Sequence, residues 1–145
     1  QCPYNNDVNY VAKYGRLYNS LAALDVRNIA TEGWHVPSVD EWNALITFLG
    51  GSNVAGGKLK ETGTTNWDSP NTGATNESGF TALPGGYRSY NYSSEDLTRH
   101  GIWLAVDKTN NSAHTFDLSW LYDFVMKDSN PTIHTYGYSV RCIKD

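Results

Sequence analysis

Basic residues, cysteines and long apolar runs are all scarce in this chain of 145 residues. Eleven Lys and Arg stand against fifteen Asp and Glu, which gives a formal net charge of −4, and no basic cluster offsets it. Because nucleic-acid binding depends on neutralising phosphates, we expect no nucleic-acid partner. No apolar run approaches the roughly 18 residues that span a bilayer, so we expect no insertion into a membrane either.

The sequence motifs of catalysis are missing as well. There is no Cys-x-x-Cys, no His-Glu-x-x-His, no phosphate-binding glycine loop and no Gly-x-Ser-x-Gly. The four histidines have no short metal-ligand spacing, and we interpret His35 as ordering the backbone around it. A hydrolase would use Asp117, Asp123 and Asp128, but aspartates that solvate surface loops are the interpretation we favour. We therefore expect no enzyme, no metal ligands and no cofactor.

Aromatic residues are the abundant class. They make up 13% of the chain, with ten Tyr and five Trp, whereas charged residues make up 18%. This composition is typical of a compact, loop-rich extracellular domain, and the length predicts one domain over residues 1–145. We expect Trp34, Trp42 and Trp67 to lie in the core or to anchor loops.

The segment Ser38–Leu49 predicts a helix with both ends encoded in the sequence. Ser38 is a favourable N-cap, and Glu41 three residues later completes a capping box. Trp42, Leu45, Ile46 and Leu49 follow at helical spacing and form one apolar face. The glycines at 50 and 51 then supply a left-handed stop.

Weaker patterns predict the remaining elements. Alternating polarity predicts a strand over His114–Trp120 with Phe116 and Leu118 facing inward. The Gly, Thr, Asn and Ser content of Thr62–Gly79 predicts a long irregular loop. The other expectations are a strand at Tyr14–Tyr18, a possible helix in Asn19–Val26, a short strand or helical turn at Lys58–Glu61, core strands at Phe80–Leu83 and Ile102–Val106, a tight turn at Gly85-Gly86, a strand at Phe124–Lys127 beside His114–Trp120, and a closing strand at Tyr136–Ile143.

Several long motifs occur in one order along the chain: "EGWHVPSVDEWNALITFLGG", "VAGGKLKETG", "TNESGFTALPGGYR" and "YGYSVRCIKD". They resemble the Fibrobacter succinogenes major paralogous domain, a family abundant in secreted and surface proteins of gut Bacteroidetes. The resemblance implies an α+β fold of the C-type-lectin-like kind, shared with the formylglycine-generating, sulfatase-modifying family. The chain lacks the family's usual opening strand pair with its "W-M-A-E-N-L" segment, so we expect it to belong to a longer protein.

The fold that the resemblance implies brings the two ends of the chain into one small sheet. A disulfide between Cys2 and Cys142 is therefore one reading, and two unpaired thiols are the other. The sulfatase-modifying relatives use a pair of active-site cysteines near the C-terminus, but only Cys142 lies there. The sugar-binding triplets of true C-type lectins, which hold calcium, are also missing. A calcium site built from loop oxygens is possible but is not indicated.

The segment from Ile102 to His134 departs most from the family pattern. Framework residues are retained around scattered unlike ones, which is similar to the variable regions written by diversity-generating retroelements. Aromatic side chains beside Asp and Asn suit recognition, because Tyr and Trp give large contact areas at low entropic cost. The candidate ligand-binding residues are Trp103, His114, Asp117, Ser119, Trp120, Tyr122, Asp123, Phe124, Asp128, Ile133 and His134.

These observations together predict an extracellular ligand-binding module, displayed on a bacterial cell surface or a phage tail. Its expected partner is a glycan or protein receptor on a cell surface, and assembly as a homotrimer is possible. The alternative is a structural display or spacer domain whose tail has merely drifted. A carbohydrate-active enzyme that uses the tail aspartates is a weaker alternative. An exposed aromatic patch would favour binding, whereas a polar surface would favour the spacer.

Overall fold

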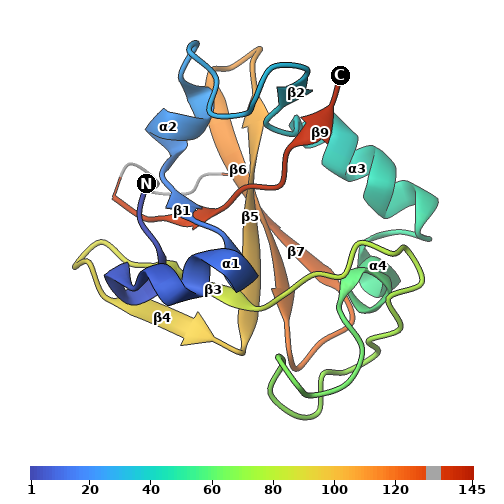
Figure 1. Ribbon diagram of the computed structural model, residues 1–145. Coiled ribbons are helices and arrows are strands. Elements are labelled where there is room, and N and C mark those ends of the chain that lie inside the picture. The colour runs from blue at the N-terminus through green and yellow to red at the C-terminus, as the bar shows by residue number, and fades with distance from the viewer. Residues whose placement is uncertain (130–134) are drawn as a thin grey trace.

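The computed structural model describes residues 1–129 and 135–145 (Figure 1). Two predicted ligand-binding residues, Ile133 and His134, lie outside the described residues. The elements are short 3₁₀ helices η1 (Tyr4–Asn6) and η2 (Val8–Tyr10), helices α1 (Val11–Tyr14), α2 (Ser20–Leu24), α3 (Val39–Phe48) and α4 (Ser52–Leu59), and strands β1 (Leu17–Tyr18), β2 (Trp34–His35), β3 (Gly85–Arg88), β4 (Ser94–Leu97), β5 (His100–Asp107), β6 (Ser112–Ser119), β7 (Val125–Asp128), β8 (Tyr138–Ser139) and β9 (Ile143–Lys144).

A twisted sheet with β5 at its centre organises the fold. Strands β5 and β6 form a hairpin with eight residue pairs, and β7 continues it on the far side of β6. On its other edge β5 pairs in parallel with β8 and β3, which extend the sheet to β1 and β4. A separate pair joins β2 to β9. The mixed strands and few helices confirm the predicted α+β class.

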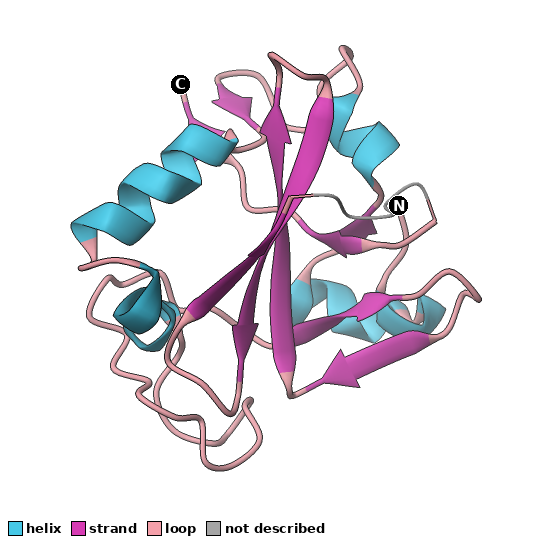
Figure 2. Cartoon of the chain, turned by 180° about the vertical axis from the view of Figure 1, so that it is seen from behind, coloured by secondary structure: helices cyan, strands magenta, loops and turns pink. Residues whose placement is uncertain are grey.

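The two faces of the β5–β6 hairpin pack against different helices (Figures 1 and 2). On the first face, Trp103, Phe116 and Leu118 pack against α3 and α4 around Trp42. On the second face, Leu104, Val106 and Ala113 pack with Ala23 of α2. Phe116 and Leu118 are 0% and 1% exposed, so the predicted inward face of this strand is confirmed.

Helix α3 forms as its sequence predicts. The Ser38 hydroxyl accepts a hydrogen bond from the Glu41 amide, and the Glu41 carboxylate accepts one from the Ser38 amide. Trp42, Ile46 and Leu49 are buried. The glycines at 50 and 51 take φ angles of 100° and 96°, which end the helix.

Two predicted boundaries are wrong in the first half of the chain. Tyr14 lies in α1, so the first strand is only Leu17–Tyr18. Residues 52–59 form α4, and its two central glycines concealed this helix because glycine is a poor helix former. Of the three tryptophans expected in the core or as loop anchors, Trp42 and Trp67 lie in the core, whereas Trp34 is 41% exposed and lies outside it.

Gly85 and Gly86 begin strand β3 instead of making a tight turn. A side-chain carbon at Gly86 would lie 2.3 Å from the Glu95 carbonyl oxygen, so glycine is needed where β4 passes close by. Phe80–Leu83 forms only an isolated bridge, between Ala82 and Lys60, and not a strand. Cys2 and Cys142 are free thiols, so the disulfide reading is not the arrangement seen.

Candidate ligand-binding surface

The loop after β6 presents aromatic side chains to solvent. The rings of Tyr122 and Phe124 stack with centroids 4.8 Å apart, and Tyr122 is 47% exposed. Trp120 is half-buried, packs on the main core, and lies with the Arg99 guanidinium 5.9 Å from its ring centroid. We call residues 120–124 the aromatic loop.

A buried lysine forms hydrogen bonds with the backbone of the aromatic loop and of its neighbours. Lys60 is 0% exposed, and its ammonium group donates hydrogen bonds to the carbonyl oxygens of Thr72, Ser119 and Tyr122 at 2.8, 2.9 and 2.8 Å. Burial lowers the pKa of Lys60 to about 8, and the charge of Asp123 acts in the opposite direction. The lysine is therefore mostly charged at neutral pH, and its three bonds join the aromatic loop to the long loop after α4.

Glycines of α4 let the same loop approach the helix closely. The amide of Gly57 donates to the Asp123 carbonyl oxygen at 2.9 Å. A side-chain carbon at Gly56 would lie 2.5 Å from the Phe124 carbonyl oxygen, and one at Gly57 would lie 2.3 Å from that of Gly73. Backbone contact, rather than side-chain packing, thus sets the position of the aromatic loop.

A second aromatic surface gathers four tyrosines from two distant segments. Tyr136 lies at its centre, with ring centroids about 6 Å from those of Tyr87, Tyr90 and Tyr138. The Tyr136 and Tyr138 rings are nearly parallel, with 8° between their planes. Tyr90 is 64% exposed and the other three are half-buried, so the cluster faces solvent. We call these four residues the tyrosine face.

Ionisable side chains border the tyrosine face. The Tyr87 hydroxyl donates to Glu95 at 2.9 Å. Burial raises the pKa of Tyr138 to about 12, with further contributions from Tyr136, Asp128 and Asp117. The charges of both aspartates therefore act on the Tyr138 hydroxyl, while Glu95 is the carboxylate that directly contacts a ring hydroxyl of this cluster.

A histidine–aspartate pair adds to this border. The Nδ1 atom of His100 lies 2.9 Å from Oδ1 of Asp117. This hydrogen bond raises the pKa of His100, and burial acts against it. In the sheet register Asp117 stands opposite Ile102 and Met126, so these three side chains share the second face of the sheet.

The model of one family, described as the Fibrobacter succinogenes major domain, matches residues 1–144. The chain belongs to this family. No curated protein gives a significant match, and no solved structure does either. The Fibrobacter succinogenes major domain thus spans the sheet, the aromatic loop and the tyrosine face together.

Two predicted site residues of this family member are buried, and two others, His114 and Asp123, are half-buried. Trp103 and Ser119 are 6% and 3% exposed, and Trp103 packs in the core, so neither offers a side chain to a ligand. His114 is half-buried, its Nδ1 has no hydrogen-bond partner, and burial, with the nearby charge of Lys127, lowers its pKa. Asp123 contributes to the position of the aromatic loop through its backbone carbonyl.

The remaining predicted residues fall into two groups. Trp120, Tyr122 and Phe124 belong to the aromatic loop, and Asp117 and Asp128 border the tyrosine face. The tyrosine face itself was not predicted, although three tyrosines between residues 87 and 92 were a visible signal. Lys60 was also missed, because nothing in its local sequence marks it as buried.

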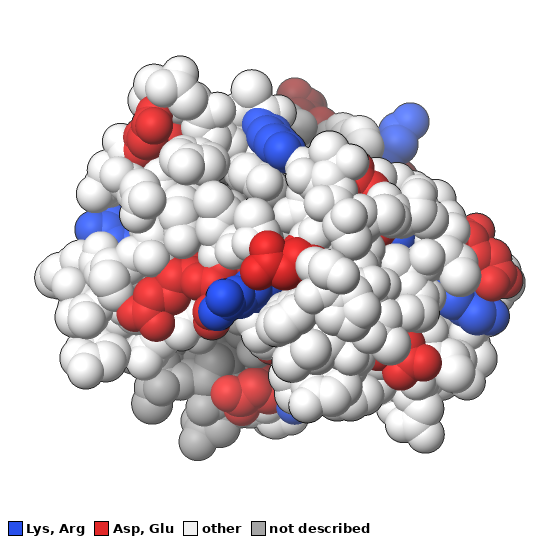
Figure 3. Space-filling view, turned by 90° about the horizontal axis from the view of Figure 1, so that it is seen from below, with Lys and Arg blue, Asp and Glu red and all other residues white. Residues whose placement is uncertain are grey.

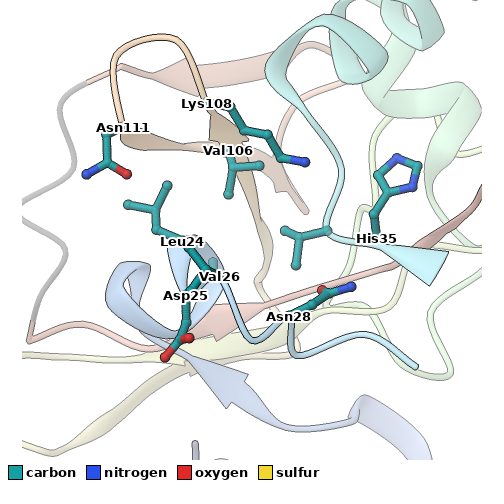
Figure 4. A pocket seen from close by; sticks show the side chains of 10 residues that line it. Leu24, Asp25, Val26, Asn28, His35, Val106, Lys108 and Asn111 are labelled. Atoms are coloured by element: carbon teal, nitrogen blue, oxygen red, sulfur yellow. The ribbon is translucent and has the colours of Figure 1, made fainter. Parts of the chain in front are cut away.

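Two hollows border β2 and the turn between β5 and β6. One of about 530 Å³ is lined by Leu24, Val26 and Asn28 near α2, by His35 of β2, and by Lys108 of the β5–β6 turn (Figure 4). Within the described residues, no three His, Cys, Asp or Glu side chains gather as a metal site. None of the helices described is long and apolar enough to cross a membrane.

Charge is evenly spread over the lower surface of the domain. Figure 3 shows acidic and basic side chains interspersed on a mostly uncharged surface. Among the described residues, the Arg27 side chain pairs with Asp25 and that of Arg99 pairs with Asp68.

Proposed function

We propose that this domain is an extracellular, non-catalytic ligand-binding module of C-type-lectin-like fold, and that its tyrosine face contacts a glycan on a cell surface. The observation that carries the proposal is the cluster of Tyr87, Tyr90, Tyr136 and Tyr138, exposed at Tyr90 and bordered by carboxylates. A spacer domain has no need of contiguous solvent-facing aromatic rings.

The chemistry of the tyrosine face suits a sugar. Flat rings pack against the C–H faces of a pyranose, while the hydroxyl groups of a sugar need acceptors at the edge of the rings. The Glu95 carboxylate, which accepts a hydrogen bond from the Tyr87 hydroxyl, is such an acceptor, and the charges of Asp117 and Asp128 also act on Tyr138. Tyrosines that are packed against one another lose little conformational entropy on binding, which favours affinity. A protein receptor is the other partner class, and it would use the same rings.

The aromatic loop supplies a second contact area. Leu121 and Tyr122 are 42% and 47% exposed, and the hydrogen bonds from Lys60 hold the loop in one conformation. A ligand larger than one sugar would reach this area as well. Display on a bacterial surface or a phage tail, and assembly as a homotrimer, would multiply such contacts through avidity.

The test is a binding screen with matched variants. Fluorescently labelled protein is applied to a glycan array and to bacterial cells, and the positive ligands are titrated against Tyr90→Ala and Tyr136→Ala. Both changes are expected to weaken binding at least about tenfold, because aromatic anchors dominate interfaces. Val26→Ala is the matched control, since Val26 is 99% exposed beside the distant hollow near α2.

Three outcomes separate the alternatives. Unchanged binding in both tyrosine variants would contradict the tyrosine face as the contact. Tyr122→Ala is titrated in the same way. Loss of ligand binding in this variant alone would assign the contact to the aromatic loop. Absence of any ligand on array and cells would favour the spacer. The origin of the variable segment is tested separately, by finding a near-copy of codons 102–136 beside a reverse-transcriptase gene with differences mainly at adenines.

A further inference from the structure

Arg88 ends strand β3 next to the tyrosine face. Its amide donates to the Gly137 carbonyl oxygen at 2.9 Å, and the Gly137 amide donates back at 2.8 Å. A side-chain carbon at Gly137 would lie 3.3 Å from Cβ of both Arg88 and Leu17. These contacts fix the backbone of Arg88, so its side chain extends from a well-positioned Cα atom.

The guanidinium group of Arg88 has no anionic partner. In residues 1–129 and 135–145, no carboxylate lies within 4.0 Å of it, and its buried Nε has no hydrogen-bond partner. Its central carbon lies 5.1 Å from the ring centroid of Tyr92. Arg27 and Arg99, in contrast, each contact an aspartate. A buried donor without a partner is costly, so the described residues leave part of the hydrogen-bonding capacity of Arg88 unused.

A hollow of about 270 Å³ opens in front of this side chain. No Asp or Glu of the described residues lines it, although the chain as a whole carries a net charge of −4. Polar side chains that carry no negative charge, such as Asn19, Thr135 and Tyr136, line it instead. The residues that line the hollow are Gln1, Cys2, Leu17, Asn19, Arg88, Tyr92, Thr135, Tyr136 and Gly137.

Tyr136 connects this hollow to the tyrosine face. It lines the hollow, and its ring also contacts those of Tyr87, Tyr90 and Tyr138. A sugar residue stacked on the tyrosine face could therefore place a substituent, or a neighbouring residue, in the hollow. A guanidinium group binds carboxylates and phosphates in a bidentate manner, which a neutral sugar cannot match.

We infer that the glycan recognised by this domain is acidic, and that Arg88 binds the carboxylate of a uronic or nonulosonic acid residue while the tyrosine face holds the adjoining sugar. This inference rests on the proposed function. It names the ligand class that the proposed function leaves open. Sulfated or phosphorylated glycans share the anionic chemistry and are distinguished by the probes below.

The experiment compares acidic and neutral forms of the same glycan by calorimetry and biolayer interferometry. The probes are 3′-sialyllactose against lactose, and polygalacturonate against its methyl ester, with a sulfated lactose as the third arm. The native domain is expected to prefer a carboxylated probe over its neutral form by about tenfold or more. Arg88→Gln should abolish this preference, and Arg88→Lys should retain part of it.

Lys108→Gln is the matched control, because it removes one positive charge beside the hollow near α2. If it reduces the preference as much as Arg88→Gln does, general electrostatics is responsible and the inference is wrong. A preference for sulfated over carboxylated probes overturns the assignment to carboxylates. Binding of acidic and neutral forms with equal affinity, lost in Tyr90→Ala, overturns the inference but leaves the proposed function standing. Failure of every probe to bind the native domain also overturns the inference.

Discussion

The ammonium group of Lys60 lies 2.8 Å from the carbonyl oxygen of Tyr122, although 62 residues separate them in the chain. This contact joins the end of α4 to the most exposed aromatic side chain of the aromatic loop. The charged side chain of Lys60 thus anchors the aromatic loop from a buried position. The conformation of an exposed surface then depends on a residue that no ligand touches.

Replacing Lys60 tests this dependence. Lys60→Met is expected to lower the free energy of unfolding by about 2–4 kcal/mol, because three backbone carbonyl oxygens lose their donor. Urea denaturation measures the effect. Lys58→Met is the control: its ammonium lies 3.5 Å from Glu77 on the surface, so a change of at most about 1 kcal/mol is expected. Equal stabilities of the two variants would contradict the fixing role.

Gly57 tests the close approach of α4 to the neighbouring loops. Gly57→Ala would place a carbon 2.3 Å from the Gly73 carbonyl oxygen, so we expect a loss of about 1–3 kcal/mol in the free energy of unfolding. Asn53→Ala, at an exposed position of the same helix, should be neutral or slightly stabilising because alanine is a better helix former. A stabilising effect of Gly57→Ala would show that the contact is not tight.

His35 predicts a pH dependence of stability. Its Nδ1 lies 2.7 Å from Asp145 and its Nε2 lies 2.8 Å from Glu41, and these hydrogen bonds raise the pKa of His35 above its ordinary 6.5. Because the folded state holds the proton more tightly, the stabilisation is complete below pH 6.5 and is lost as the pH rises through the raised pKa.

Glu41 limits the same stabilisation on the acid side. Burial opposes the shift, but hydrogen bonds from Ser38 and His35 lower the pKa of Glu41 below its ordinary 4.5. Its contribution is therefore present above pH 4.5 and is lost as the pH falls through the lowered pKa. Urea unfolding should be measured across this pH range. As the pH rises through the raised pKa of His35, the free energy of unfolding should fall less for His35→Gln than for the native domain. Identical pH profiles would refute the role of His35.

The His100–Asp117 pair predicts a specific titration. The Asp117 hydrogen bond raises the pKa of His100, so NMR of the imidazole protons should find it above 6.5. Asp117→Asn removes the negative charge and should bring the pKa of His100 down. His114, whose pKa burial lowers, serves as the internal reference and should barely move. An unchanged pKa of His100 in Asp117→Asn would contradict the pairing.

Local patterns determined what depends on local interactions. The capping box, the apolar spacing from Trp42 and the terminal glycines encode α3 within its own residues, and the structure confirms it. The alternation around Phe116 and Leu118 likewise encodes a strand with one buried face. The family was also recognisable, because its motifs run in one order along the chain.

Only the tertiary structure decided what the surface presents. Tyr87 and Tyr136 become neighbours because β3 and β8 both pair with β5, and no local pattern encodes that pairing. Trp103 was expected at the surface, yet its strand turns it towards α3. Lys60 is buried because three carbonyl oxygens, from the long loop, the end of β6 and the aromatic loop, converge on it. Alternation and capping act between neighbours in sequence, whereas a binding surface and its support depend on long-range packing.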